Sequence, residues 1–395
     1  MAVPLIQLIP LPAAIWAQLP GREEAALAPA LAGVAPGWIP MSLTPDRTWA
    51  TALALIPALG VFFACLVVDS ASRFRLVAVV LIGAVLSMGL GALQLAEGGD
   101  AFHLDARTAD GAVSGFFVNR NHLAAFILMS LPFAAVLAAP GRRLPVSPQM
   151  LRWGCALFGL LAIVTLAAIR SRAGIVLLAP AIVMCLFIIM RSSEAGQSIR
   201  ALRLWATGVV AAGLAVLAFG LSPLMARFES AGSGQDRLDR WPEVLEAAGR
   251  YQPIGGGIGS FRPIYGSVEP VAELDNTFFN HAHNDYLELW LEAGWLGMVV
   301  LALAVIWAAP RWLRAWRKGP GNGDPLALAA GAALILIALH SVVDFPIRSE
   351  TNLVVVALCL GLIAAAEPRR KSLPAPPPSR SEGPSGPAFG LDPEM

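Results

Sequence analysis

Two histidines precede a helix-start pattern in the segment NHAHNDYLELWLEAGWLGM. Asp285, followed three residues later by Glu288, resembles a capping box, so His283 is expected just outside the N-terminus of a helix that continues into an apolar run. The dipole there disfavours an imidazolium ion, and a general base must be a neutral imidazole. His283 is therefore the first candidate base, and the alternative is a histidine that only anchors a helix at a membrane interface.

Three arginines are candidates for binding an anion. Arg170 and Arg172 lie in a short IRSRAG turn between two apolar runs, and Arg240 precedes Pro242, a residue type favoured at the start of a helix. A guanidinium group pairs well with phosphate oxygens, and a helix N-terminus also attracts them. The alternatives are arginines that extend to lipid headgroups and a surface helix in which Asp236 pairs with Arg240.

The sequence does not indicate a metal, cofactor, disulfide or nucleotide site. No DxD or His/Glu cluster lies in the predicted external loops, and the four cysteines fall within apolar runs without a CxxC spacing. The segment PIGGGIGSF lacks the GK[ST] of a phosphate-binding loop. We interpret it as a glycine-rich turn that allows the backbone to approach another segment closely.

The composition points to a membrane protein. Of the 395 residues, 56% are hydrophobic and 14% are charged, and the mean hydropathy is +0.65, which exceeds what the core of a soluble domain requires. A net charge of +1 argues against a nucleic-acid partner, because such proteins concentrate Lys and Arg on one face. The expected fold class is therefore an all-α polytopic membrane protein surrounded by membrane lipid.

About nine to ten spans are expected in this chain, because a spanning helix needs about 20 apolar residues. The candidate runs are 48–68, 76–96, 121–141, 153–169, 173–190, 204–226, 286–310, 325–345 and 351–366, with boundaries uncertain by several residues.

Basic residues in alternate short loops predict the orientation, since such loops stay in the cytoplasm. The loops 97–120 and 227–283 are then extracytoplasmic, and 227–283 is the large external loop of a membrane domain over 48–366. We expect 1–47 to be an N-terminal extracytoplasmic segment with a partial helix and 367–395 to be a disordered cytoplasmic tail. An external start is unusual for this topology, so further helices are expected upstream.

The chain resembles the O-antigen ligase and O-antigen polymerase superfamily over about residues 110–366. The superfamily's hallmark is a His-Asn pair, nine residues and then Gly-x-x-Gly, and here these are His283, Asn284, Gly294 and Gly297. The segments GFFVNRNHLAAF, IRSRAG, RWPEVLEAA followed by PIGGGIGSF, and HSVVDFP are also similar to family segments.

This resemblance implies a C-type glycosyltransferase-like helical bundle in the bacterial inner membrane, with its active site facing the periplasm. It implies an undecaprenyl diphosphate-linked glycan donor and an inverting transfer without a metal ion. The family's catalytic histidine matches His283, and its two essential arginines match Arg172 and Arg240, with Arg170 as the alternative to Arg172. Further residues expected near the same cavity are Asn119, His122, His281, Asn284, His340 and Asp344.

The acceptor stays open at this point. Members that cap lipid A core, members that extend a polysaccharide and members that glycosylate proteins share these motifs, so ligase, polymerase and protein O-glycan ligase are all carried forward. A lipid-linked glycan transporter or flippase is the alternative from a different class. We disfavour it because the candidate histidine and arginines lie on one external face and the sequence shows no internal repeat.

Overall fold

The computed structural model describes residues 1–35, 37–98, 101–103, 113–138, 147–192, 238–270, 279–318 and 324–366. In these ranges the chain is helical, apart from turns and one small antiparallel sheet of β1 (Pro10–Pro12) and β2 (Trp38–Pro40). The predicted all-α class is confirmed.

Six described helices are long and apolar enough to cross a membrane. They are α4 (Pro45–Val67), α5 (Ser70–Ala96), α6 (Arg120–Ala138), α7 (Pro148–Ile169), α8 (Arg172–Ser192) and α13 (Asp285–Arg317). Two shorter apolar helices follow, α14 (Pro325–His340) and α15 (Glu350–Ala364). They confirm a multi-pass membrane protein, while the expected span 204–226 and the expected tail 367–395 lie outside the described residues.

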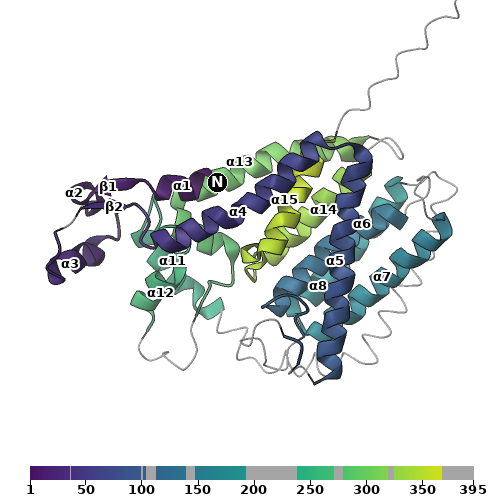
Figure 1. Cartoon of the computed structure of the whole chain (residues 1–395), viewed down its shortest axis with the longest axis horizontal. Helices are drawn as coiled ribbons and strands as arrows, with labels where there is room; N and C mark the ends of the chain where they lie inside the picture. Colours follow the sequence, from purple (N-terminus) through teal and green to yellow (C-terminus); the bar gives the residue numbers. More distant parts are fainter. Residues whose placement is uncertain are drawn as a thin grey trace, which may run out of the picture.

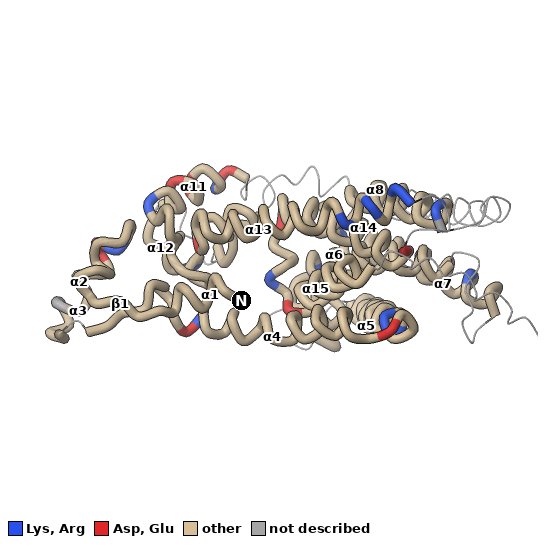
Figure 2. Tube along the Cα trace, turned by 90° about the horizontal axis from the view of Figure 1, so that it is seen from above, with Lys and Arg blue, Asp and Glu red and all other residues tan. Residues whose placement is uncertain are grey.

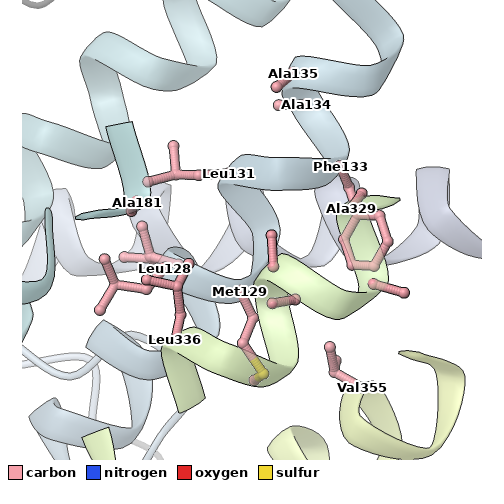
Figure 3. Close-up of a cluster of buried hydrophobic side chains, with 14 of the residues drawn as sticks. Leu128, Met129, Leu131, Phe133, Ala134, Ala135, Ala181, Ala329, Leu336 and Val355 are labelled. Carbon is pink, nitrogen blue, oxygen red and sulfur yellow. The ribbon is translucent and has the colours of Figure 1, made fainter. Parts of the chain in front are cut away.

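Helix α6 is the centre of the bundle, packed against α7, α8 and α14 (Figure 1). In its apolar window 89% of the residues are buried by protein, against 17% in α4, so α6 is enclosed by helices whereas α4 leaves most of its surface to lipid. Figure 3 shows Leu128, Met129 and Phe133 of α6 together with Leu336 of α14 and Val355 of α15.

A smaller unit lies beside the start of α13. It is formed by α11 (Trp241–Arg250) and α12 (Phe261–Val268), whose apolar faces pack on Leu291 of α13. Charged residues are more frequent on α11 and α12 than along the bundle helices α6 and α14, as Figure 2 shows. This pattern fits a unit outside the apolar layer.

The N-terminal segment, with α1 (Ala2–Gln7), α2 (Ala13–Trp16) and α3 (Glu23–Leu31), lies at the same end of the molecule (Figure 1). Gln7 donates to the backbone oxygen of Glu292 at 2.8 Å and accepts from the backbone N–H of Ile258 at 2.9 Å. Arg22 is buried and donates to the backbone oxygens of Met41 and Gly255. The N-terminal segment therefore stabilises the glycine-rich turn through hydrogen bonds.

The glycine-rich turn approaches a kink in α13. Gly294 has φ 55° inside the helix, and a Cβ atom there would lie 2.3 Å from the backbone oxygen of Pro253. Gly257 donates to the backbone oxygen of Glu292 at 2.8 Å, and Trp295 donates to that of Pro253 at 3.0 Å. The prediction of a close backbone approach is confirmed, and its partner is the first glycine of the Gly-x-x-Gly pair.

Candidate functional site

The start of α13 positions the histidine segment. Asn284 is its N-cap, and Oδ1 of Asn284 accepts from the backbone N–H groups of Tyr286 at 2.9 Å and Leu287 at 3.1 Å. The interpretation of Asp285 as the cap was wrong, because its carboxylate instead accepts from the hydroxyl of Ser341 at 2.8 Å. His283 lies just outside the helix with φ 48°.

His283 is held by a buried carboxylate. Its Nδ1 lies 3.3 Å from Oδ1 of Asp344, and the two side chains are 16% and 2% exposed. The amide of Asn121 and the backbone N–H of Phe345 also donate to this carboxylate. Burial alone raises the pKa of Asp344, but the hydrogen bond and the charge of His283 outweigh it and lower the pKa to about 2. An ionised carboxylate on Nδ1 leaves Nε2 of His283 to accept a proton.

Three of the predicted histidines surround one aromatic ring. The imidazole centroids of His281, His283 and His122 lie 4.1, 4.9 and 5.0 Å from the ring centroid of Phe345. The start of α6 positions His122. There, Oδ1 of Asn119 accepts from the backbone N–H of Asn121 at 2.8 Å. Segments more than 200 residues apart in sequence therefore meet at one point.

A second carboxylate holds His281. Nδ1 of His281 lies 2.8 Å from Oε1 of Glu288, and the other carboxylate oxygen accepts from the backbone N–H of Ala282 at 3.1 Å. The Glu288 side chain is 1% exposed, whereas that of His281 is 32% exposed. The carboxylate is thus fixed inside the protein, and the imidazole reaches the surface of the site.

Arg348, in the short 3-10 helix η3 (Pro346–Arg348), neutralises the acidic face of α13. Its guanidinium lies 2.8 Å from Glu292, 3.4 Å from Glu288 and 3.9 Å from Asp285. Burial lowers the pKa of Arg348, but Glu288, Glu292 and Asp285 raise it further, so the net shift is upward.

Our sequence reasoning missed this cluster. A signal was present, because positions 285, 288 and 292 fall on one face of an otherwise apolar helix, where carboxylates are costly without a cation. Asn121 and Phe345 were also missed as partners of the site.

Arg240 lies at the N-cap of α11, at the helix N-terminus where it was predicted. It donates to the hydroxyl of Tyr265 and to Glu269, both at 2.9 Å, and its guanidinium carbon lies 5.3 Å from the ring centroid of Phe279. That ring in turn lies 5.9 Å from the imidazole of His283. Arg240 and His283 therefore approach the same aromatic ring, while Asp236, the alternative partner of Arg240, lies outside the described residues.

The turn from α7 to α8 carries the other two arginines. Arg170 ends α7 in the left-handed conformation with φ 56°, and Oγ of Ser171 accepts from the backbone N–H of Gly174 at 3.1 Å, so Arg172 is the first residue of α8. A Cβ atom on Gly174 would lie 3.0 Å from Cβ of Ala124 in α6. This turn therefore adjoins the first turns of α6, the helix that carries His122.

The last predicted residue, His340, is fully buried at the end of α14, and its backbone oxygen accepts from the backbone N–H of Asp344 at 3.1 Å. Neither of its ring nitrogens has a hydrogen-bond partner among the residues that the structure describes. Within the same ranges, no group of three or more His, Cys, Asp or Glu side chains is arranged to hold a metal ion.

The structure is thus a multi-pass helical bundle that holds histidine–carboxylate pairs and an arginine near one end of α13, groups whose chemistry suits proton transfer and anion binding. The family model described as O-Antigen ligase matches residues 157–302, which include α8, α11 and the histidine segment. Over these residues the chain is similar to the O-antigen ligase and polymerase superfamily, whose members are glycosyltransferase-like ligases and polymerases. A comparison with curated proteins found no match.

Proposed function

We propose that this protein transfers a glycan from an undecaprenyl diphosphate carrier to a sugar hydroxyl of lipid A core or of a growing polysaccharide. We place the reaction on the periplasmic face of the bacterial inner membrane. The observation that carries the proposal is the pair of His283 and the ionised Asp344, with Arg240 one aromatic ring away. The family match supports the reaction class, and the approach of His283 and Arg240 to the ring of Phe279 supports a base and a cation at one site.

In the proposed step the acceptor oxygen bonds to the anomeric carbon as the bond from that carbon to the diphosphate breaks. The electron pair of the broken bond stays on the diphosphate, and the acceptor proton passes to Nε2 of His283. Arg240 and Arg172, with Arg170 as the alternative to Arg172, neutralise the diphosphate, a task that a metal ion performs in many sugar-transfer enzymes. Attack opposite the leaving group inverts the anomeric configuration, so NMR should show a β-linked product from an α-linked donor.

Glycan transfer in membranes that contain the full-length protein tests this proposal. At matched protein levels, His283→Ala should lower transfer by about 10²- to 10⁴-fold and Arg240→Ala by about 10²- to 10³-fold, and lipid-linked donor should accumulate. Arg250→Ala is the control, because Arg250 is an exposed arginine on the same helix that pairs only with Glu246 among the described residues. Undiminished transfer in both variants would overturn the assignment and favour a lipid-linked glycan transporter.

The acceptor is tested in the same membranes by supplying lipid A core, an oligosaccharide with a free non-reducing end, or a protein acceptor. We expect one of the two carbohydrate acceptors to be used. Transfer to the protein alone would contradict the proposal and identify a protein O-glycan ligase.

A further inference from the structure

The geometry points to His281 as a second proton-transfer residue, which gives a proton to the leaving diphosphate while His283 removes one from the acceptor hydroxyl. This inference rests on the proposed function. The proposed reaction needs one base, which removes the proton of the acceptor hydroxyl. A second group that donates a proton to the leaving diphosphate would assist the bond that breaks.

His281 has the arrangement that a proton-transfer residue requires. Its Nδ1 is 2.8 Å from a carboxylate oxygen of Glu288, a shorter distance than the 3.3 Å between His283 and Asp344. A carboxylate on Nδ1 fixes the orientation of the ring and directs Nε2 away from the protein interior. The His281 side chain is 32% exposed and its partner is 1% exposed, so part of the imidazole is open to a substrate.

The charges behind His281 suit a residue that carries a proton. Asp285, Glu288 and Glu292 share one guanidinium, that of Arg348, so the buried cluster contains more carboxylates than cations. Burying unpaired carboxylates is costly, and a proton shared between Glu288 and His281 reduces this cost. His281 connects this cluster to the surface of the site.

The two histidines lie at one aromatic ring as separate groups. Their ring centroids lie 4.1 Å and 4.9 Å from the same ring, that of Phe345, so they are distinct groups at one site. In inverting glycosidases the acid and the base act from opposite sides of the anomeric carbon and lie about 6 to 10 Å apart. Two imidazoles on one phenyl ring can meet this separation.

The proton balance closes within the site. The bond from the acceptor oxygen to the anomeric carbon forms, and the bond to the diphosphate oxygen breaks with its electron pair. His281 then donates the proton on Nε2 to that oxygen, and His283 receives the acceptor proton on its own Nε2. A proton that returns from His283 to His281 through water restores both residues without any other reactant.

Several charged and titratable groups face these histidines. Glu288 of α13, Arg348 of η3 and His122 of α6 face His281. Those facing His283 are Asp344 and His122 of α6, and His340 of α14 faces Asp344. A pH experiment must therefore compare variants in which all of these groups are retained.

The test is the pH dependence of kcat/KM for the full-length protein in proteoliposomes with an undecaprenyl diphosphate-linked donor. The wild-type profile should be bell-shaped, because the proposed step needs one group without its proton and one group with its proton. His281→Gln retains an N–H donor for Glu288 and should lower kcat/KM by about 10²- to 10⁴-fold with loss of the alkaline limb. His283→Gln should instead lose the acid limb, and the control Arg250→Ala should keep both.

A His281→Gln protein that keeps both limbs would overturn the inference and leave the proposed function intact. Absence of transfer by the wild-type protein would instead refute the proposed function. If His281→Gln is too slow to measure, His281→Ala is assayed with added imidazole. Rescue would support proton transfer by His281, whereas no rescue in a variant with wild-type thermal unfolding would overturn it.

Discussion

At the residue scale, the hydrogen bond between His283 and Asp344 makes the stability of the site dependent on pH. The pKa of Asp344 is about 2 in the folded protein, below the ordinary 3.8. A carboxylate whose pKa is lowered by folding stabilises the fold above about pH 4, and this contribution is lost as the pH falls toward 2.

Asp344→Asn should therefore lower the free energy of unfolding by about 2 kcal/mol near neutral pH. The difference between the wild type and the variant should shrink below about pH 4. Thermal unfolding of the two detergent-solubilised proteins across this pH range measures this difference. A difference between wild type and variant that stayed constant down to pH 2 would contradict the assigned ionisation of Asp344.

Arg348 is expected to be the most costly charge to remove near the site. Arg348→Met leaves Asp285, Glu288 and Glu292 without their shared cation, and breaking a buried ion pair in this way costs about 3 to 5 kcal/mol. The control Arg250→Met removes an exposed pair and should cost less than about 1 kcal/mol. Chemical denaturation compares the two, and similar losses would show that the Arg348 cluster contributes little to stability.

Single residues were predictable where the signal is local. His283 and Arg240 were placed correctly relative to the helices that follow them, because helix starts have their own sequence pattern. Glu288 was assigned to a capping box, because a spacing of three residues also places two side chains on one face of a helix. Arg348 was missed because Glu292, its nearest carboxylate partner, lies 56 residues away in the sequence.

At the scale of elements, the kink in α13 depends on the absence of a side chain at Gly294. Gly294→Ala would place a Cβ atom 2.3 Å from the backbone oxygen of Pro253 in a left-handed conformation, so at least about 2 kcal/mol of stability should be lost. Gly266→Ala in α12 is the matched control, because nothing lies within 4 Å of its Cβ position, and it should be neutral or slightly stabilising. Thermal unfolding temperatures of the two variants test this, and equal values would argue against a tight contact at Gly294.

The glycine-rich turn shows how far sequence reasoning reaches for an element. The composition of PIGGGIGSF predicted a close backbone approach correctly, because positive φ angles and missing Cβ atoms serve that purpose. It did not indicate which segment approaches. The partner is the kink at Gly294, and its pairing with the turn depends on the packing of α11 and α12 on α13.

At the scale of the whole molecule, the proposed orientation can be tested by labelling. Arg250→Cys on α11 should react with a membrane-impermeant maleimide in intact cells, and Arg75→Cys near the start of α5 should react only after permeabilisation. The wild-type protein is a suitable background because Cys65, Cys155, Cys185 and Cys359 are all buried. The opposite labelling pattern would reverse the proposed topology.

Six of the eight spans expected within the described ranges are long apolar helices, and the other two are the shorter helices α14 and α15. The sequence did not reveal which helix lies at the centre. The central helix α6 has a mean hydropathy of 1.7, the lowest of the six long helices, whereas the largely exposed α4 has 2.4. Hydropathy measures how readily a segment leaves water and does not distinguish lipid from protein as its new surroundings. Helix α6 accordingly contains Ser130, whose hydroxyl bonds back to its own helix.

The kink at Gly294 also has a mechanical consequence. Because it frees the backbone oxygens of Leu291 and Glu292 to accept from the glycine-rich turn, that turn is tied by hydrogen bonds to the first turns of α13. Arg240 lies at the start of α11, before this turn, and His283 lies just before α13. Under the proposed function, a shift of α11 on donor binding would therefore reach the segment that holds the histidine.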